Sequence, residues 1–229
     1  PIAENFKAAR ILQALDGETI AYHVLEGKTP GVMFLGGLMS DMSGTKALAL
    51  EAHCRAEGRA FVRFDYFGHG ESSGTFVDGT IGRWHADTLR VLDTIAEGPQ
   101  LLIGSSMGGW QMLLAARARP DRIAGLIGVA AAPDFTENLM WAQFDDSMKA
   151  RIHEESVIYL PSDYKSKPYP VSRALIEDGR NHLLLDSRLS LDCPVHLIQG
   201  MADQDVPWQT ALAIAEAVTS NNVMVTLIK

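Results

Sequence analysis

A serine at the centre of a glycine-flanked turn has the clearest chemical signature in this sequence. The motif Gly104-Ser105-Ser106-Met107-Gly108 follows the apolar residues 101–103 and precedes a stretch of helical composition at 110–119. A G-x-S-x-G motif between a strand and a helix is typical of a nucleophile elbow, in which backbone strain exposes the serine and small neighbours let strand and helix approach. The glycine spacing selects Ser106 over Ser105. We predict that Ser106 is a nucleophile; an ordinary glycine turn is the alternative.

A serine hydroxyl needs a base to take its proton and an acid to orient that base. With this type of elbow the chain order is serine, acid, histidine. Asp203 and Asp205 follow the apolar run 194–199, at the end of a predicted strand where ligands bind in open α/β sheets. We favour Asp203 as the acid and Asp205 as the cap of the next helix. Asp134 is a more distant candidate, because a helix cap accounts for it.

Two backbone N–H groups are needed to stabilise the oxyanion that forms during acyl transfer. One comes from the residue after the nucleophile, Met107, and the other from the loop after an earlier strand. In Leu35-Gly36-Gly37-Leu38-Met39 that second donor is predicted to be Leu38. Each such donor typically lowers the barrier by about 3 kcal/mol. A simple tight turn at the two glycines is compatible with this role.

No histidine occupies the expected place, because all of them precede Asp203. They are His23, His53, His69, His85, His153, His182 and His196. Since the histidine should follow the last predicted strand, 223–228, we expect it beyond Lys229. His69, in a Gly-His-Gly turn, and His182 are weaker alternatives. For the 229 residues given we expect slow hydrolysis or none.

The elements that must position these residues alternate between short apolar runs and longer runs of helical periodicity. This pattern predicts an α/β fold with a mostly parallel central sheet and helices on both faces. The runs 10–15 and 19–25 flank Asp16-Gly17, a hairpin signal that predicts an antiparallel N-terminal edge. The other predicted strands are 32–36, 60–65, 100–105, 123–130, 194–199 and 223–228, and the predicted helices are 43–57, 80–96, 107–118 and 207–219.

The alternation is interrupted once, by an insertion at 132–193 that we predict to be a lid or cap on a core of residues 1–131 and 194–229. Asp134 and Glu137 have the spacing of a capping box, which predicts a helix from there. A second helical piece carrying Met148 and Ile152 follows, before several prolines. We expect substrate contacts from three residues of the first piece. They are Leu139, Trp141 and Phe144.

The bulk composition excludes several classes of function. The net charge is −8 with scattered charges, which argues against a nucleic-acid partner. Apolar runs fall short of the about 18 residues of a membrane span. The two cysteines, Cys54 and Cys193, lack metal-ligand spacing and are predicted to be buried thiols, so we expect neither metal nor cofactor. A bacterial cytoplasm is the favoured compartment, with a mitochondrial matrix as the alternative; the sequence makes no prediction of oligomeric state.

With these residues placed, the sequence resembles the α/β-hydrolase-domain family that includes mitochondrial acyl-glucuronide esterases and palmitoyl-protein thioesterases, together with bacterial relatives. The resemblance implies an α/β-hydrolase fold, a nucleophile at Ser106, an acid at Asp203 and a histidine a few residues after Lys229. The insertion is the part least alike. The motifs that carry the resemblance are Gly44-Thr45-Lys46-Ala47-Leu48-Ala49, Arg63-Phe64-Asp65-Tyr66, Gly98-Pro99-Gln100, Gly104-Ser105-Ser106-Met107-Gly108-Gly109-Trp110, Leu126-Ile127-Gly128-Val129-Ala130 and Val206-Pro207-Trp208.

We therefore predict a serine hydrolase that cleaves a small-molecule or lipid-acyl ester or thioester through an acyl-enzyme on Ser106. Carbon–carbon bond hydrolysis or perhydrolysis on the same scaffold is one alternative. A catalytically silent ligand-binding protein that lacks the base is the other, because losing a triad base removes about 10⁴-fold to 10⁶-fold of rate.

Overall fold

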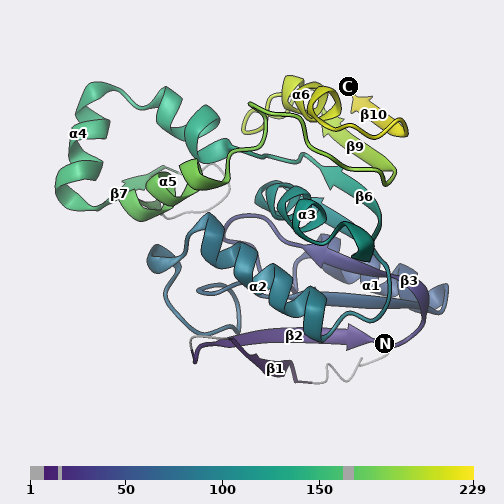
Figure 1. The fold of residues 1–229 in the computed structure, drawn as a ribbon. Helices are drawn as coiled ribbons and strands as arrows, with labels where there is room; N and C mark the ends of the chain where they lie inside the picture. Colours follow the sequence, from purple (N-terminus) through teal and green to yellow (C-terminus); the bar gives the residue numbers. More distant parts are fainter. Residues whose placement is uncertain (1–7, 15–16, 162–167) are drawn as a thin grey trace.

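An eight-stranded sheet forms the centre of the computed structural model, which describes residues 8–14, 17–161 and 168–229 (Figure 1). The strand order is β1-β2-β4-β3-β5-β6-β9-β10. β2 is antiparallel to β1 and β4, and the other neighbours are parallel. The bounds are β1 Arg10–Gln13, β2 Thr19–Leu25, β3 Lys28–Leu35, β4 Arg59–Phe64, β5 Gln100–Ser105, β6 Ile123–Val129, β9 Val195–Gly200 and β10 Val223–Ile228. The predicted α/β fold with an antiparallel N-terminal edge is confirmed; of the predicted Asp16-Gly17 turn, Asp16 lies outside the described residues.

Helices cover both faces of the sheet because its inner strands are apolar on both sides. On β3, Val32 and Phe34 pack with Ala47 and Cys54 of α1, whereas Met33 and Leu35 belong to the larger core on the other face. That larger core also includes residues of α2, α3 and α6 (Figure 1). The helices are α1 Thr45–Ala56, α2 Ile81–Thr94, α3 Met107–Ala118 and α6 Gln209–Ala217.

The insertion between β6 and β9 forms a separate lobe at one side of the sheet (Figure 1). It has a small apolar cluster of its own, made of Phe144, Ile152, Ile158, Val171 and Ile176. The antiparallel β7–β8 pair was not predicted, because Pro168 and Pro170 obscured it; a two-stranded sheet has only edges, where a missing N–H is tolerated. Its elements are a π-helical turn Thr136–Met140, a 3₁₀ turn Trp141–Gln143, α4 Asp146–Glu155, β7 Val157–Leu160, β8 Tyr169–Ser172, α5 Arg173–Gly179 and a 3₁₀ turn Arg180–His182.

The predicted helix opened by an Asp134–Glu137 capping box is wrong. Asp134 has a φ of 58°, and its carboxylate accepts hydrogen bonds from the N–H groups of Leu184 at 2.9 Å and Leu185 at 2.8 Å. The turn that follows has Phe135 at its N-cap and no side-chain capping bond. Because Asp134 binds a segment fifty residues downstream, it is not available to cap the helix beside it.

Candidate active site

The predicted elbow has a strained geometry that only small flanking residues allow. Ser106 lies between β5 and α3 with φ 53° and ψ −120°. A Cβ atom on Gly108 would lie 2.0 Å from the carbonyl oxygen of Leu35, and one on Gly104 would lie 2.4 Å from that of Gly108. Both distances are too short for a side chain, so the two glycines are required for β5, α3 and β3 to meet here.

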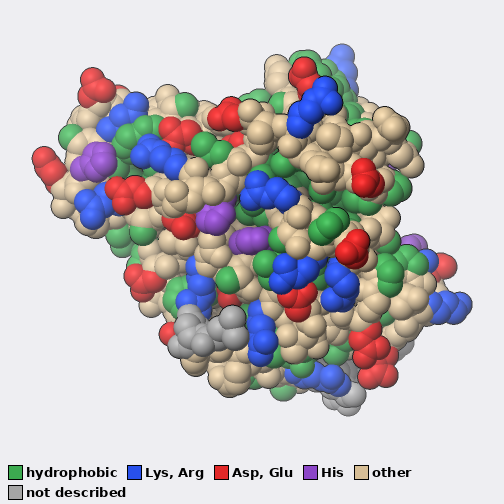
Figure 2. Space-filling model, in the orientation of Figure 1, with side chains coloured by type: hydrophobic (Ala, Val, Ile, Leu, Met, Phe, Trp, Pro, Cys, Tyr) green, Lys and Arg blue, Asp and Glu red, His purple; other side chains and the backbone are tan. Residues whose placement is uncertain are grey.

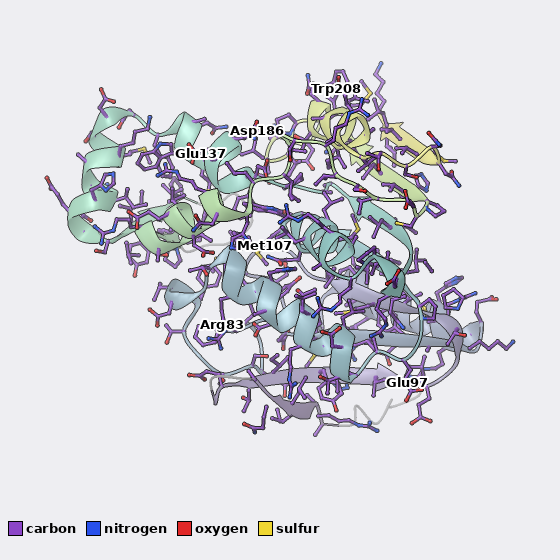
Figure 3. The ribbon with its side chains drawn as sticks, in the orientation of Figure 1. Arg83, Glu97, Met107, Glu137, Asp186 and Trp208 are labelled. Carbon is purple, nitrogen blue, oxygen red and sulfur yellow. The ribbon has the colours of Figure 1, made fainter. Side chains whose placement is uncertain are left out.

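A cavity of about 540 Å³ opens beside Ser106. Met107 begins α3 at the end that faces the insertion (Figure 3), so the positive end of that helix dipole points to the site. The cavity is lined by four segments: the loop after β3, the elbow, the insertion and the loop after β9. The lining residues are Gly37, Leu38, Met39, Ser40, Lys46, Ser105, Ser106, Met107, Ala132, Phe135, Leu139, Met140, Gln143, Tyr169, Gln204, Asp205 and Val206.

The two predicted oxyanion donors both line this cavity. In the described part of the chain neither the Leu38 N–H nor the Met107 N–H has a hydrogen-bond partner. The loop that carries Leu38 passes close to the nucleophile, because a Cβ atom on Gly37 would lie 3.4 Å from the Cβ of Ser106. Unpaired backbone donors around one serine are what stabilisation of an oxyanion requires.

The two carboxylates after β9 have different surroundings. Oδ1 of Asp203 accepts hydrogen bonds from the N–H groups of Asp205 and Val206, both at 3.0 Å, which fixes its orientation. Asp205 is exposed and lines the cavity. The alternative role predicted for Asp205 as a helix cap is wrong, since α6 has Trp208 at its N-cap and no side-chain capping bond. Asp134 is buried, and burial raises the pKa of its carboxyl group.

All seven histidines are described, and none lines the cavity. His69 is buried, and its Nε2 accepts the Met39 N–H at 3.1 Å. His182 lies 3.6 Å from Asp178, outside the cavity lining. At the sheet edge, the Met201 N–H donates to the Ile228 carbonyl oxygen at 2.7 Å, so the end of β10 lies beside the loop that carries Asp203.

Of the three lid residues predicted to contact substrate, only Leu139 lines the cavity. Phe144 packs inside the insertion's own cluster instead. Trp141 packs against the same cluster, with the guanidinium of Arg180 4.8 Å and the Lys149 ammonium 5.4 Å from its ring centre. The error arose because the expected α-helix is a π turn followed by a 3₁₀ turn, which rotates these side chains differently.

Sequence reasoning missed several lining residues from the insertion, among them Phe135, Met140, Gln143 and Tyr169. No sequence pattern indicated that Tyr169 would line the cavity, because it lies between two prolines in a strand that was not predicted. Phe135 and Met140 are apolar neighbours of the predicted set, and only the observed turn geometry distinguishes them.

Within the described ranges, no group of three or more His, Cys, Asp or Glu side chains is arranged to hold a metal ion. No helix in this described part of the chain has the length and apolar character needed to cross a membrane. Cys54 is buried as predicted, whereas Cys193 is only partly buried; both are free thiols.

A family model described as serine aminopeptidase, S33, matches residues 31–204 of this chain. The chain belongs to this hydrolase family. The predictions of an α/β-hydrolase fold and of a serine hydrolase of ester or thioester bonds are confirmed at that level.

Relatives match over nearly the whole chain. Human mitochondrial palmitoyl-protein thioesterase ABHD10 is 41% identical over 230 residues, which cover 100% of this chain and 75% of the relative. The solved structure of mouse α/β-hydrolase domain-containing protein 10 has a TM-score of 0.90 at 40% identity and covers 97% of this chain and 89% of its own. A putative hydrolase from Agrobacterium vitis S4 has a TM-score of 0.91 at 39% identity, covering 96% and 89%.

Proposed function

We propose that this hydrolase cleaves acyl thioesters, and related acyl esters, through an acyl-enzyme on Ser106. The observation that carries the proposal is the strained Ser106 beside a cavity lined by Leu38 and Met107. The N–H groups of these two residues have no hydrogen-bond partner among the described residues. Ser106 Oγ attacks the acyl carbon, and the Leu38 and Met107 N–H groups stabilise the negative oxygen of the tetrahedral intermediate. The thiol or alcohol leaves with a proton, and water then releases the carboxylic acid.

The acid in this mechanism is Asp203, whose carboxylate is already held by two backbone N–H groups. We propose that the base is a histidine that follows β10 in the chain, since that strand ends beside the Asp203 loop. Such a histidine takes the Ser106 proton and returns it to the leaving group. The prediction is checked by comparing kcat of the 229 residues with kcat of a chain extended by the next natural residues.

The acyl part of the substrate is argued from the apolar wall that the insertion adds to the cavity. Phe135, Leu139 and Met140 provide aliphatic and aromatic surface close to the nucleophile. Curated relatives at 40–44% identity are named palmitoyl-protein thioesterases, which supports an acyl thioester as substrate. A series of acyl thioesters and esters from two to sixteen carbons is expected to give kcat/KM that rises with chain length, by roughly tenfold for every two buried methylenes. A flat series would contradict an apolar acyl site.

A fluorophosphonate probe tests the nucleophile itself. Wild-type protein should be labelled, Ser106→Ala should not, and the neighbouring Ser105→Ala should still be labelled. Ser105 is a matched control because it also lines the cavity and lies one residue away. Labelling of Ser106→Ala at the wild-type rate would exclude Ser106.

A silent ligand-binding protein is the second candidate, because none of the seven histidines lines the cavity. The two candidates differ in turnover: a silent protein binds acyl ligands but fails to hydrolyse them even when the chain is extended past Lys229. Hydrolysis by the extended chain, lost in Ser106→Ala, would exclude it.

The cellular compartment of this protein is proposed from its relatives. The similar curated proteins are named mitochondrial, and a bacterial protein of known structure is about as similar. We propose a bacterial cytoplasm or a mitochondrial matrix, and subcellular fractionation with an antibody to the native protein distinguishes them.

A further inference from the structure

Two buried side chains of one turn hold the loop that carries the oxyanion donor Leu38. The turn follows β4. Nε2 of His69 accepts the Met39 N–H at 3.1 Å, and Oδ1 of Asp65 accepts the Met42 N–H at 2.7 Å. Both side chains are almost fully buried, with 4% and 2% of their surface exposed. The loop after β3 is therefore fixed on both sides of Ser40 by groups that do not line the cavity.

The turn around His69 is shaped for this contact. Gly68 and Gly70 flank the histidine with φ values of 70° and 46°, in the left-handed region that favours glycine. A Cβ atom on Gly70 would lie 2.1 Å from Oδ2 of Asp65, and that oxygen also accepts the Glu71 N–H at 2.8 Å. The same carboxylate thus joins the turn to the loop.

The imidazole of His69 is held in one orientation and one tautomer. Its ring makes edge contacts with Tyr66, Phe76 and Trp84, with centroids 5.7, 5.2 and 5.3 Å away. Since Nε2 accepts a hydrogen bond, it carries no proton, and Nδ1 donates to the Phe67 carbonyl oxygen at 3.1 Å. Only a neutral ring with its proton on Nδ1 satisfies both contacts.

Met39 needs such support because its φ of 57° is unfavourable for a residue with a side chain. Its N–H belongs to the same peptide unit as the Leu38 carbonyl, so the bond to His69 sets the plane of the peptide that follows Leu38. The Leu38 N–H belongs to the preceding peptide unit, so the bond to His69 holds the backbone directly after Leu38 and limits movement of that N–H away from the position needed by the oxyanion.

We propose that His69 is a positioning residue for the oxyanion hole. It acts through Met39 and Leu38 rather than as the catalytic base. The proposal rests on the function proposed above, because it assumes that Leu38 donates to the oxyanion. It gives the Gly68-His69-Gly70 turn a role in the reaction without contact to substrate.

Two substitutions separate hydrogen bonding from packing. His69→Phe keeps an aromatic ring against Tyr66, Phe76 and Trp84 but removes the acceptor, and His69→Gln places an amide oxygen near the Nε2 position. In the active full-length enzyme, His69→Phe should lower kcat by about tenfold to 100-fold with KM changed less than about twofold, since removing an oxyanion donor outright costs about 100-fold to 1000-fold. His69→Gln should recover most of kcat. His53→Gln, an exposed change on α1, should match wild type.

Wild-type kcat in His69→Phe would overturn the proposal. So would equal losses of kcat in the Phe and Gln variants that follow equal losses of melting temperature, because packing alone would then account for them. A second measurement needs no turnover: ¹⁵N NMR of the His69 ring should show the proton on Nδ1, and a proton on Nε2 would overturn the proposal. If wild type lacks activity and Ser106 is not labelled while the ring has the expected tautomer, the proposed function fails instead.

Discussion

The nucleophile turn depends on glycines that have no room for a methyl group. At Gly108 a Cβ atom would lie 2.0 Å from a backbone oxygen of β3, which has no flexible side chain to move aside. The close approach of β3, β5 and α3 at this point is what directs Ser106 toward the cavity. The stability of the fold and the geometry of the site are therefore set by the same residue.

Gly108→Ala is expected to destabilise the protein by more than about 3 kcal/mol, at the upper end for single substitutions. Labelling of Ser106 by a fluorophosphonate should also be lost, because relief of the clash moves α3 away from β3. Denaturant unfolding measures the first effect. Gly36→Ala is the matched control, since a Cβ atom there meets nothing within 4 Å. Equal stability of the two variants would show that the turn can relax.

Asp203 and Asp205 are separated by one residue but differ in what holds them. Asp203→Asn keeps an oxygen for the Asp205 and Val206 N–H groups, so its fold should persist, while kcat falls about 10³-fold to 10⁴-fold for loss of a triad acid. Asp205→Asn, at the exposed cavity wall, should change kcat by less than about fivefold. Steady-state kinetics of both variants on one ester measures these changes in kcat. A large loss of kcat in Asp205→Asn with little loss in Asp203→Asn would make Asp205 the acid.

At the scale of elements, the sheet was predictable and the insertion was not. Each strand of the sheet is a short apolar run bounded by turn residues, and this local pattern also placed Ser106 and the two loops that meet it. The insertion depends on distant partners: Asp134 bonds to Leu184, and Trp141 packs on Arg180. Local periodicity therefore predicted an α-helix where residues 136–143 form a π turn and a 3₁₀ turn. For the same reason, two of the three predicted lid contacts were wrong.

Trp110 links the elbow helix to the insertion. It is fully buried in α3, packs edge-on against Phe135 at 5.5 Å, and its Nε1 donates to the His182 carbonyl oxygen at 3.0 Å. Trp110→Phe removes that bond and leaves a smaller ring, which should cost about 1–3 kcal/mol. Because the lost contact is to the insertion, proteolysis should speed up there before global unfolding.

The control for that substitution is Trp208→Phe at the start of α6, which Figure 3 shows at the top of the core. Trp208 is only partly buried, and in the described residues its side chain has no hydrogen bond. Limited proteolysis followed by mass spectrometry should find faster cleavage within 145–161 for Trp110→Phe alone. Faster cleavage in both variants would mean that general destabilisation, not loss of the link, exposes the insertion.

At the scale of the whole molecule, core and insertion meet through polar contacts near the start of α2. The Gly82 N–H donates to Oδ2 of Asp178 at 2.7 Å, and Oδ1 of the same carboxylate lies 3.6 Å from Nε2 of His182. Figure 2 shows histidine side chains gathered at the surface between the insertion and the core. His85, one turn further along α2, has a buried Nδ1 without a partner among the described residues.

This arrangement makes the stability of the folded protein sensitive to acid through His85. Burial, together with the smaller effects of the neighbouring His182, Arg117 and Arg119, lowers its pKa from 6.5 to about 4. The folded protein therefore resists protonation of His85, whereas the unfolded chain takes up the proton near pH 6.5. The contribution of neutral His85 to the free energy of unfolding is present above pH 6.5 and is lost as the pH falls toward 4, by at most about 3 kcal/mol.

His85→Gln should flatten this loss of stability, because the amide stays neutral. Burial raises the pKa of Asp65 and Asp134, which makes acidification favour the folded state, but both groups are present in either protein and cancel in the difference. Urea unfolding at intervals from pH 7.5 to pH 4 should show the variant gaining on wild type only below about pH 6.5. His53→Gln, exposed on α1, should follow the wild-type curve. Parallel curves for wild type and His85→Gln would mean that the pKa of His85 is the same in the folded and the unfolded protein, and that the contact between insertion and core accommodates the charge.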